Sequence, residues 1–136
     1  MGAKDWLMRA WYLDKEINLL LKEQRLAFEK ATSATAKPKD VCVKSSGARA
    51  TASEIYAEYS IQVDQITDER VKIKKEITNI IRKVDDVQLR ILLFARYVRC
   101  MKWDDVADTL GRDKDHVTKR LHPKALKKIE EILNAP

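Results

Sequence analysis

Apolar residues recur three and four positions apart along two long stretches of the chain, which is the spacing that gives a helix one apolar face. In residues 4–31 this repeat runs through Trp6, Ala10, Leu13, Ile17, Leu20, Ala27 and Ala31, with Gln24 as its polar member. In the second stretch Ser53 is the expected N-cap, and the repeat runs through Tyr56, Tyr59, Val63, Ile66, Ile73, Ile77, Ile80 and Val84. The pattern predicts two long, heptad-like helices.

Residues 32–52 separate the two helices and read as a loop, since they are rich in Ala, Ser, Thr and Lys and contain Pro38 and Gly47. Each apolar stripe needs a partner, which an antiparallel hairpin within the chain or a second chain would supply. We expect a coiled-coil hairpin that also forms a homodimer through the N-terminal helices. Arg70 interrupts the second stripe; it either pairs with an acid across the seam or extends outward, and we expect the second.

The pair Asp85-Asp86 marks the start of a different region, because acidic residues are favourable at a helix N-terminus. A helix is expected from there to about Arg99. The domains are therefore predicted as residues 1–85, a helical oligomerisation region, and residues 86–136, a compact C-terminal domain. Three glycines and three prolines among 136 residues leave few tight turns, so the fold class is all-α.

Residues 103–121 carry the pattern of a helix-turn-helix. Val106, Ala107 and Leu110 give a short helix one apolar face, and Gly111 supplies the left-handed residue that ends it. Asp113 then caps a second helix, expected over 113–122, which buries Val117 and Leu121. A small residue four positions before the glycine permits close packing of the two helices.

The net charge of +6 is unevenly distributed. Residues 30–49 carry 5 basic against 1 acidic residue, residues 86–136 carry 11 against 8, and the remainder is close to neutral. Within 112–128 there are seven basic residues, so one side of the C-terminal domain is expected to attract a polyanion.

Other classes of protein are disfavoured. Cys42 and Cys100 form no Cys-x-x-Cys pair, and His116 and His122 lie six apart, on different sides of a helix, so we expect no metal site. No catalytic cluster or phosphate-binding loop is present, so we expect neither enzymatic activity nor a cofactor. The longest apolar run, 91–95, is too short to cross a membrane, and 1–13 lacks a signal-peptide block. We expect a cytoplasmic protein with no membrane partner.

The residues Leu110-Gly111, Asp113, Val117 and Arg120-Leu121-His122 resemble the region-4 helix-turn-helix of bacterial sigma factors. Nearly the whole chain resembles a family of small phage and prophage proteins. The residues that carry this second resemblance are Ala31-Thr32-Ser33, Arg96-Tyr97, Trp103-Asp104-Asp105-Val106-Ala107 and Ala125-Leu126.

This resemblance implies a phage transcription regulator, similar to activators of late genes or of the terminase operon, that works in the cytoplasm of a bacterial host. Its implied partners are double-stranded DNA and bacterial RNA polymerase. Two alternatives stay open: a small terminase-like DNA-packaging subunit, and a protein-binding adaptor or inhibitor that acts on host transcription machinery.

The chain departs from the family pattern at three places. Cys100 stands where a turn glycine is usual, and Lys102 where a hydroxyl cap precedes the tryptophan. Pro123 follows His122 and cannot donate a hydrogen bond to Lys119, so the second helix is expected to stop near His122 and a separate last helix to begin at Pro123 and end by Asn134.

A helix that enters a major groove contacts base edges with its first turns and phosphates with its flanks. The base-edge candidates are Lys114, Asp115, Thr118 and Lys119, because lysine reaches guanine acceptors, a carboxylate accepts from a cytosine amino group, and the threonine methyl contacts a thymine methyl. The phosphate candidates are Arg112, Arg120, His122, Lys124 and Lys127.

Overall fold

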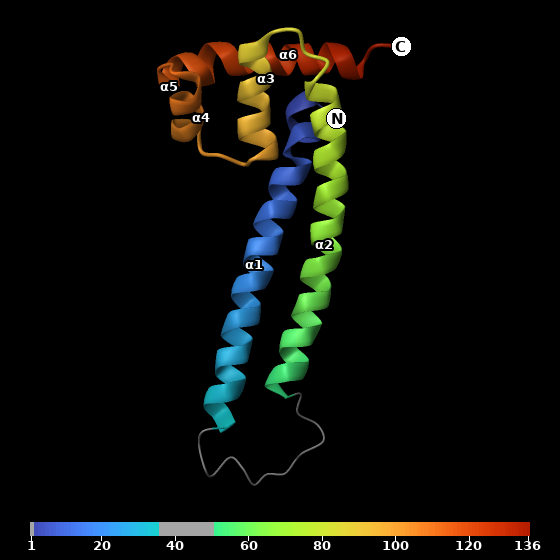
Figure 1. The fold of residues 1–136 in the computed structure, drawn as a ribbon, viewed down its shortest axis with the longest axis vertical. Coiled ribbons are helices and arrows are strands. Elements are labelled where there is room, and N and C mark those ends of the chain that lie inside the picture. The colour runs from blue at the N-terminus through green and yellow to red at the C-terminus, as the bar shows by residue number, and fades with distance from the viewer. Residues whose placement is uncertain (1, 36–50) are drawn as a thin grey trace. The chain divides into compact units, whose positions relative to one another are not determined.

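The computed structural model describes residues 2–35 and 51–136, and within these ranges all regular structure is helical (Figure 1). The expected all-α class is confirmed. In chain order the elements are α1 (Ala3–Thr35), α2 (Ala52–Ile81), α3 (Val87–Leu93), η3 (Phe94–Val98), α4 (Trp103–Leu110), α5 (Lys114–His116), η4 (Val117–Leu121) and α6 (His122–Leu133). The two η elements are π-helical turns, in which the backbone bonds to the fifth rather than the fourth residue.

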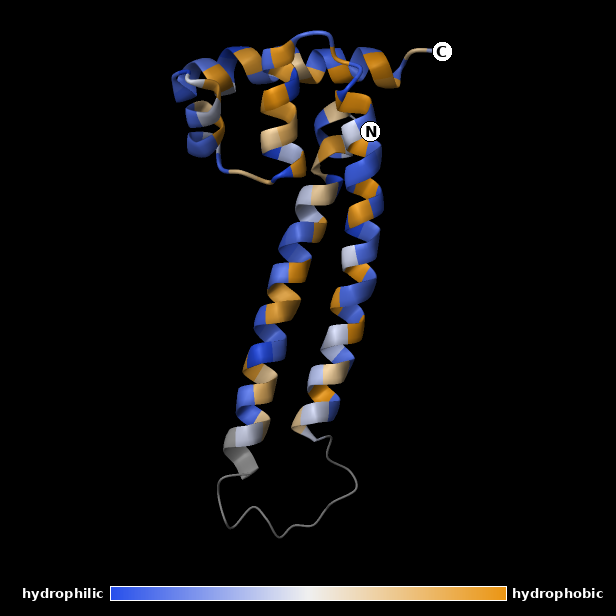
Figure 2. Ribbon diagram, in the orientation of Figure 1, coloured by the Kyte–Doolittle hydropathy of each residue, from blue (hydrophilic) through white to orange (hydrophobic). Residues whose placement is uncertain are grey.

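The chain forms two compact units. One, which we call the core unit, combines residues 1–14 with residues 70–136; the other, the helix-pair unit, spans residues 15–69. The first turns of α1 and the last turns of α2 therefore belong with the helices that follow residue 85. Figure 2 shows hydrophobic residues recurring between hydrophilic ones along both long helices.

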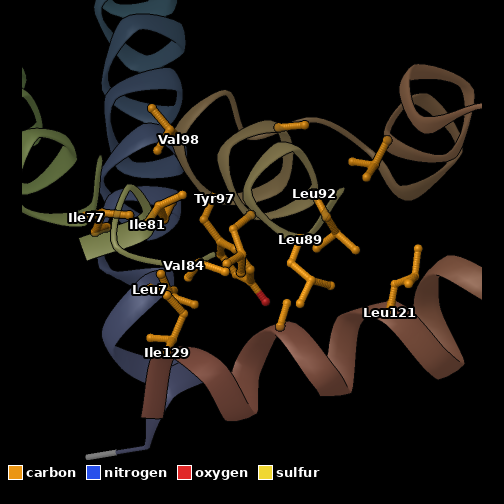
Figure 3. Close-up of a cluster of buried hydrophobic side chains, with 14 of the residues drawn as sticks. Leu7, Ile77, Ile81, Val84, Leu89, Leu92, Tyr97, Val98, Leu121 and Ile129 are labelled. Carbon is orange, nitrogen blue, oxygen red and sulfur yellow. The ribbon is translucent and has the colours of Figure 1, made fainter. Parts of the chain in front are cut away.

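The core unit is built around one cluster of buried apolar side chains (Figure 3). Leu7 comes from α1, Ile77 from α2, Leu89 and Leu92 from α3, and Ile129 from α6; each is 1% exposed or less. Five side chains from four helices thus exclude water from a single site, and at about 2 kcal/mol for each buried aliphatic side chain this burial stabilises the unit.

α3 begins where the acidic pair predicted a boundary. Asp86 is the N-cap, with extended backbone, and its carboxylate accepts hydrogen bonds from the backbone N–H groups of Gln88 at 2.8 Å and Leu89 at 3.3 Å. The Arg90 guanidinium then donates back to the Val84 carbonyl at 2.7 Å. These bonds satisfy backbone groups at the turn between α2 and α3 and fix the start of α3.

Within the core unit, Arg70 does not extend to solvent as expected. Its Nη1 donates to the Asp14 carboxylate across a distance of 2.6 Å, and both side chains are three-quarters buried. A guanidinium that is three-quarters buried is poorly hydrated, so a charge-assisted bond to an acid on α1 is more favourable than leaving the stripe. The expectation of an outward Arg70 was wrong.

Within the helix-pair unit, the polar member of the first stripe is buried and satisfied. The Gln24 amide donates to the Tyr56 carbonyl at 2.9 Å and to the Ser60 hydroxyl at 2.8 Å. The Phe28 and Tyr56 rings also meet edge to face, with centroids 5.7 Å apart. Early residues of α2 thus contact late residues of α1, so the two segments run antiparallel inside this unit.

The helix ends around the intervening segment differ from expectation. α1 continues to Thr35 rather than ending at residue 31. α2 is capped by Thr51, not Ser53: the Glu54 N–H donates to the Thr51 hydroxyl at 3.0 Å, and that hydroxyl donates to the Glu54 carboxylate at 3.1 Å. The Thr51 hydroxyl thus satisfies one free backbone N–H of the first turn, and the Glu54 carboxylate holds that hydroxyl in place. Residues 36–50, which hold Pro38, Cys42 and Gly47, lie outside the described residues.

No helix in the described ranges has both the length and the apolar character needed to span a bilayer.

Two adjacent residues of α3 provide a test of the core. Leu92 is fully buried and Ile91 is 39% exposed. We expect Leu92→Ala to lower the free energy of unfolding by about 3 kcal/mol, because it leaves a cavity that the surrounding helices cannot fill. Ile91→Ala, the matched control, is expected to cost less than about 1 kcal/mol. Urea unfolding followed by circular dichroism measures both, and equal losses would contradict this description of the core.

Candidate nucleic-acid interface

The first helix of the predicted helix-turn-helix is α4, and its start matches the departure seen in the sequence. Lys102 is the N-cap, with extended backbone and no side-chain capping bond, and Asp104 and Asp105 lie in the first turn. Carboxylates at that end interact favourably with the free N–H groups and the helix dipole. The acidic pair therefore compensates for the missing hydroxyl cap.

Cys100, two residues before the N-cap of α4, has an unusual backbone conformation. Cys100 has a φ of 56°, in the left-handed region, and it is the one non-glycine residue with positive φ among the described residues. A side chain with a Cβ costs about 1 kcal/mol or more in that conformation. The chain thus makes a left-handed turn here with cysteine, at the position where the resemblance implied a glycine.

Gly111 ends α4 as predicted. Its φ of 66° and ψ of 33° are left-handed, and its N–H donates to the Asp108 carbonyl at 3.1 Å. The Arg112 N–H donates to the Ala107 carbonyl, also at 3.1 Å. These two bonds close the helix in the manner of a Schellman motif, and they reverse the chain within a few residues.

Asp113 then caps the second helix, as the sequence predicted. Its backbone is extended and its carboxylate accepts from the Asp115 N–H at 3.2 Å. Val106 and Ala107 of α4 and Val117 and Leu121 of η4 are buried in the core. α4 and the helix that begins after Asp113 therefore both bury apolar side chains in this cluster and are joined by a glycine turn.

The second helix does not stop near His122. α5, η4 and α6 follow one another without a break, and His122 has ordinary helical backbone with φ of −61° and ψ of −48°. The His122 N–H donates to Val117, five residues back, so a widened turn precedes Pro123, and Pro123 falls in the first turn of α6. A proline is tolerated there. The expected break was wrong, while the expected end by Asn134 is confirmed, because Asn134 is the C-cap.

The four base-edge candidates lie on consecutive turns at the start of this helix. Lys114, Asp115 and Lys119 are exposed and Thr118 is half-buried. The Thr118 hydroxyl donates to the Lys114 carbonyl at 3.0 Å, so it is the methyl group that remains for contact with a base.

Lys114 already has a partner on α4. Its Nζ lies 3.1 Å from the Asp104 carboxylate, and the two side chains are 55% and 72% exposed. An ion pair this exposed is worth no more than about 1 kcal/mol, so Lys114 can leave it for a stronger anion.

Four of the five phosphate candidates are exposed: Arg112 in the turn, Arg120 in η4, and Lys124 and Lys127 in α6. Arg112 lies before the first turn of the second helix, and the other three lie after its first turns. Because α5, η4 and α6 are continuous, these cations and the base-edge candidates are carried by one rigid element and the turn before it.

His122, the fifth phosphate candidate, is differently placed. Its Nε2 is hydrogen-bonded to the Tyr97 hydroxyl at 2.6 Å, and its ring meets the Trp103 ring edge to face with centroids 4.6 Å apart. The Arg96 guanidinium covers the Trp103 ring at 4.6 Å. His122 is therefore half-buried within an aromatic cluster, where its hydrogen bond to Tyr97 helps to position the helix.

The surroundings of His122 favour the neutral ring. Burial, followed by the charges of Lys4 and Arg96, lowers the pKa of His122 to about 4. Burial also raises the pKa of Tyr97 to about 12, so its hydroxyl keeps its proton. A neutral imidazole offers no charge to a phosphate at neutral pH.

The aromatic cluster was not predicted as a unit. The contact between Tyr97 and His122 joins residues 25 positions apart on different helices. Helical periodicity reports only which residues share a face of one helix, so it contains no signal for such a pair.

Among the residues that the structure describes, no three of His, Cys, Asp and Glu come close enough together to hold a metal ion. The candidate base-edge and phosphate residues offer exposed cations, the Asp115 carboxylate and the Thr118 methyl group.

The neutral His122 gives the protein a defined sensitivity to acid. Between about pH 6.5 and about 4 the unfolded chain takes up a proton at this ring and the folded chain does not. The contribution of the neutral His122 ring to the free energy of unfolding is therefore fully present above pH 6.5, and it is lost as the pH falls through this window. We expect the step from about pH 7 to about pH 5 to cost about 1–2 kcal/mol through His122.

Urea unfolding of the protein and of His122→Gln at both pH values measures this contribution. The variant should be less stable at neutral pH but lose less on acidification. His116→Gln removes the other histidine and is the matched control, which should keep the full loss. An acid sensitivity that is the same in both variants would contradict the assignment.

Comparison with known proteins places the chain in one family. A comparison with curated proteins and one with solved structures found no match. A family profile described as "Protein of unknown function (DUF1492)" matches residues 32–130, which includes α2 and all the helices up to most of α6. Since this match covers well over half of the sequence, the chain belongs to the DUF1492 family.

Proposed function

We propose that this protein is a sequence-specific DNA-binding transcription regulator of the phage type, which reads a major groove with the helix that begins after Asp113. The observation that carries the proposal is the tight reversal at left-handed Gly111 between α4 and α5, followed by exposed Lys114, Asp115 and Lys119 on the first turns of the second helix. This is the arrangement by which helix-turn-helix proteins present side chains to base edges.

Sequence would be read by the side chains of those first turns. Lys114 and Lys119 donate to guanine, Asp115 accepts from a cytosine amino group, and the Thr118 methyl contacts thymine. Asp115 is repelled by phosphates, so it contributes only where a cytosine faces it. The proposed reading surface therefore favours sites that combine G·C pairs with an adjacent thymine.

Affinity would come from phosphate contacts made by Arg112, Arg120, Lys124 and Lys127. His122 is left out of this set, because its ring is neutral and bonded to Tyr97. The continuous helix supports the assignment, since Ala125 and Ile129 seat α6 in the core while Lys124 and Lys127 stay exposed. Phosphate contacts would thus be rigidly joined to the core.

The rest of the proposal concerns assembly. α1 and α2 would form a coiled-coil hairpin, and the N-terminal helices would join two copies, so that two reading helices meet two half-sites of one operator. Contact with bacterial RNA polymerase and a cytoplasmic location in a bacterial host follow from the resemblance to sigma region 4 and to small phage proteins.

DNA binding can be tested without knowledge of the operator. A duplex selected by the protein from a random-sequence pool should bind far more tightly than mixed-sequence DNA, and its affinity should fall steeply with salt. Lys119→Ala should weaken binding to the selected duplex by about tenfold, which corresponds to about 1–2 kcal/mol for a base contact. Fluorescence anisotropy measures these affinities.

Lys72→Ala is the matched control. Lys72 is an exposed lysine of α2, so this substitution removes the same charge at a position far from the second helix in sequence. It should leave the affinity nearly unchanged. If no sequence is enriched, or if both variants weaken binding equally, a sequence-reading role is excluded and the adaptor alternative is favoured.

The size of the assembly separates the regulator from the packaging alternative. We expect a dimer by analytical ultracentrifugation at micromolar concentration, since two reading helices suffice for a two-fold operator. A ring of many subunits would instead support a small terminase-like subunit, which also combines a DNA-binding helical domain with an oligomerisation segment.

A further inference from the structure

Two open hollows lie on the surface of the core unit, along the last three turns of α2. The first, of about 310 Å³, is lined by Val71, Lys74 and Thr78, among others. The second, of about 610 Å³, is lined by the end of α2, by α3 and η3, and by Thr109 of α4. Thr78 lines both hollows, so together they form one elongated depression, which we call the basic groove.

The floor of the basic groove is apolar. Ile81, Ile91, Phe94 and Met101 all line it, and Phe94 and Ile91 are 40% and 39% exposed. Phe94 lies on the π-helical turn η3, next to Leu93, which is fully buried. Apolar side chains gathered in a concave surface, rather than scattered singly, are typical of a site that another molecule covers.

The rim of the basic groove carries charge of one sign. Lys74 and Lys75 line the first hollow, and Arg82, Arg90 and Arg99 line the second, whereas neither hollow has an acidic residue in its lining. In the described part of the chain the structure gives Arg82 and Arg99 no carboxylate partner.

Arg90 is held in place by its bonds to the Val84 carbonyl at 2.7 Å and the Asp85 carbonyl at 3.3 Å. These bonds hold the positively charged guanidinium beside the apolar floor, where no carboxylate of the described residues is paired with it. A ligand for this surface must combine apolar side chains with several negative charges.

We propose that the basic groove binds an acidic amphipathic helix of a partner protein. A duplex would satisfy the cations but would leave Ile91 and Phe94 without apolar contacts, whereas an amphipathic helix satisfies both. From Val71 to Arg82 the groove follows α2 for about 16 Å, which matches about three turns of a bound helix.

The groove shares no residue with the proposed DNA-reading surface, so this proposal does not rest on DNA binding. It would give the protein a second, separate binding surface, and a regulator with both could bring an acidic partner to the DNA that it occupies.

A designed peptide provides the test. The probe is a fluorescein-labelled helical peptide of about 14 residues that repeats glutamate with leucine at every third or fourth position. We expect micromolar binding to the full chain. Replacing each glutamate of the peptide by lysine, or each leucine by glutamine, should weaken binding by about tenfold or more.

Variants of the protein locate the site. Arg82→Glu combined with Arg99→Glu, and separately Phe94→Ser, should each weaken binding of the acidic peptide by about tenfold. Lys72→Glu reverses a charge on α2 outside the groove and is the matched control, which should bind normally. Thermal unfolding verifies that each variant is folded. If the charge reversals prevent folding, the milder Arg82→Gln with Arg99→Gln should still weaken binding about threefold.

Three outcomes would overturn the proposal. The first is that acidic and basic peptides bind equally, and the second is that the groove variants bind as well as the Lys72→Glu control. The third is that duplex DNA displaces the peptide and the arginine variants lose DNA affinity as strongly as peptide affinity, in which case the groove is a phosphate-binding surface.

Discussion

The structure depends on burying α6 against the other helices of the core unit. Ile129 and Ala125 are fully buried, and the side chains that enclose the same cluster come from α1, α2 and α3. Because α6 continues η4 and α5 without a break, this one contact fixes the exposed residues that begin at Lys114. α4 and α5 by themselves would have little apolar surface to stabilise them.

Helical periodicity and capping rules predicted much of this arrangement. The predicted stripe residues are at least partly buried except Tyr56, which is 50% exposed, while the fully buried Leu7 lies outside the predicted stripe. The stripes, the boundary at Asp86, the left-handed Gly111 and the capping Asp113 are local properties, since each is determined by residues within one or two turns. The prediction of Ser53 as a cap failed for an equally local reason: α2 begins at Ala52, where the Thr51 hydroxyl accepts from the Glu54 N–H and is held by the Glu54 carboxylate.

Features that depend on tertiary contacts could not be predicted in this way. Whether Arg70 extends to solvent depends on Asp14, which lies 56 residues away. The partial burial of His122 depends on Tyr97 and Trp103, which its ring contacts. The break expected at Pro123 was based on α-helical bonding alone, and the widened turn of η4 changes which carbonyl each N–H meets. Sequence patterns identified the candidate surface but not the state of each side chain on it.

The unbroken run from Lys114 to Leu133 also has a mechanical consequence. No hinge separates the exposed start of this run from its buried end. A small rotation of α6 against the core would therefore turn the residues that begin at Lys114 through the same angle. The first turns of α1 form part of that core through Leu7. The packing of the first turns of α1 therefore helps to hold the exposed residues that begin at Lys114 in place, although Leu7 lies more than 100 residues before them in the sequence.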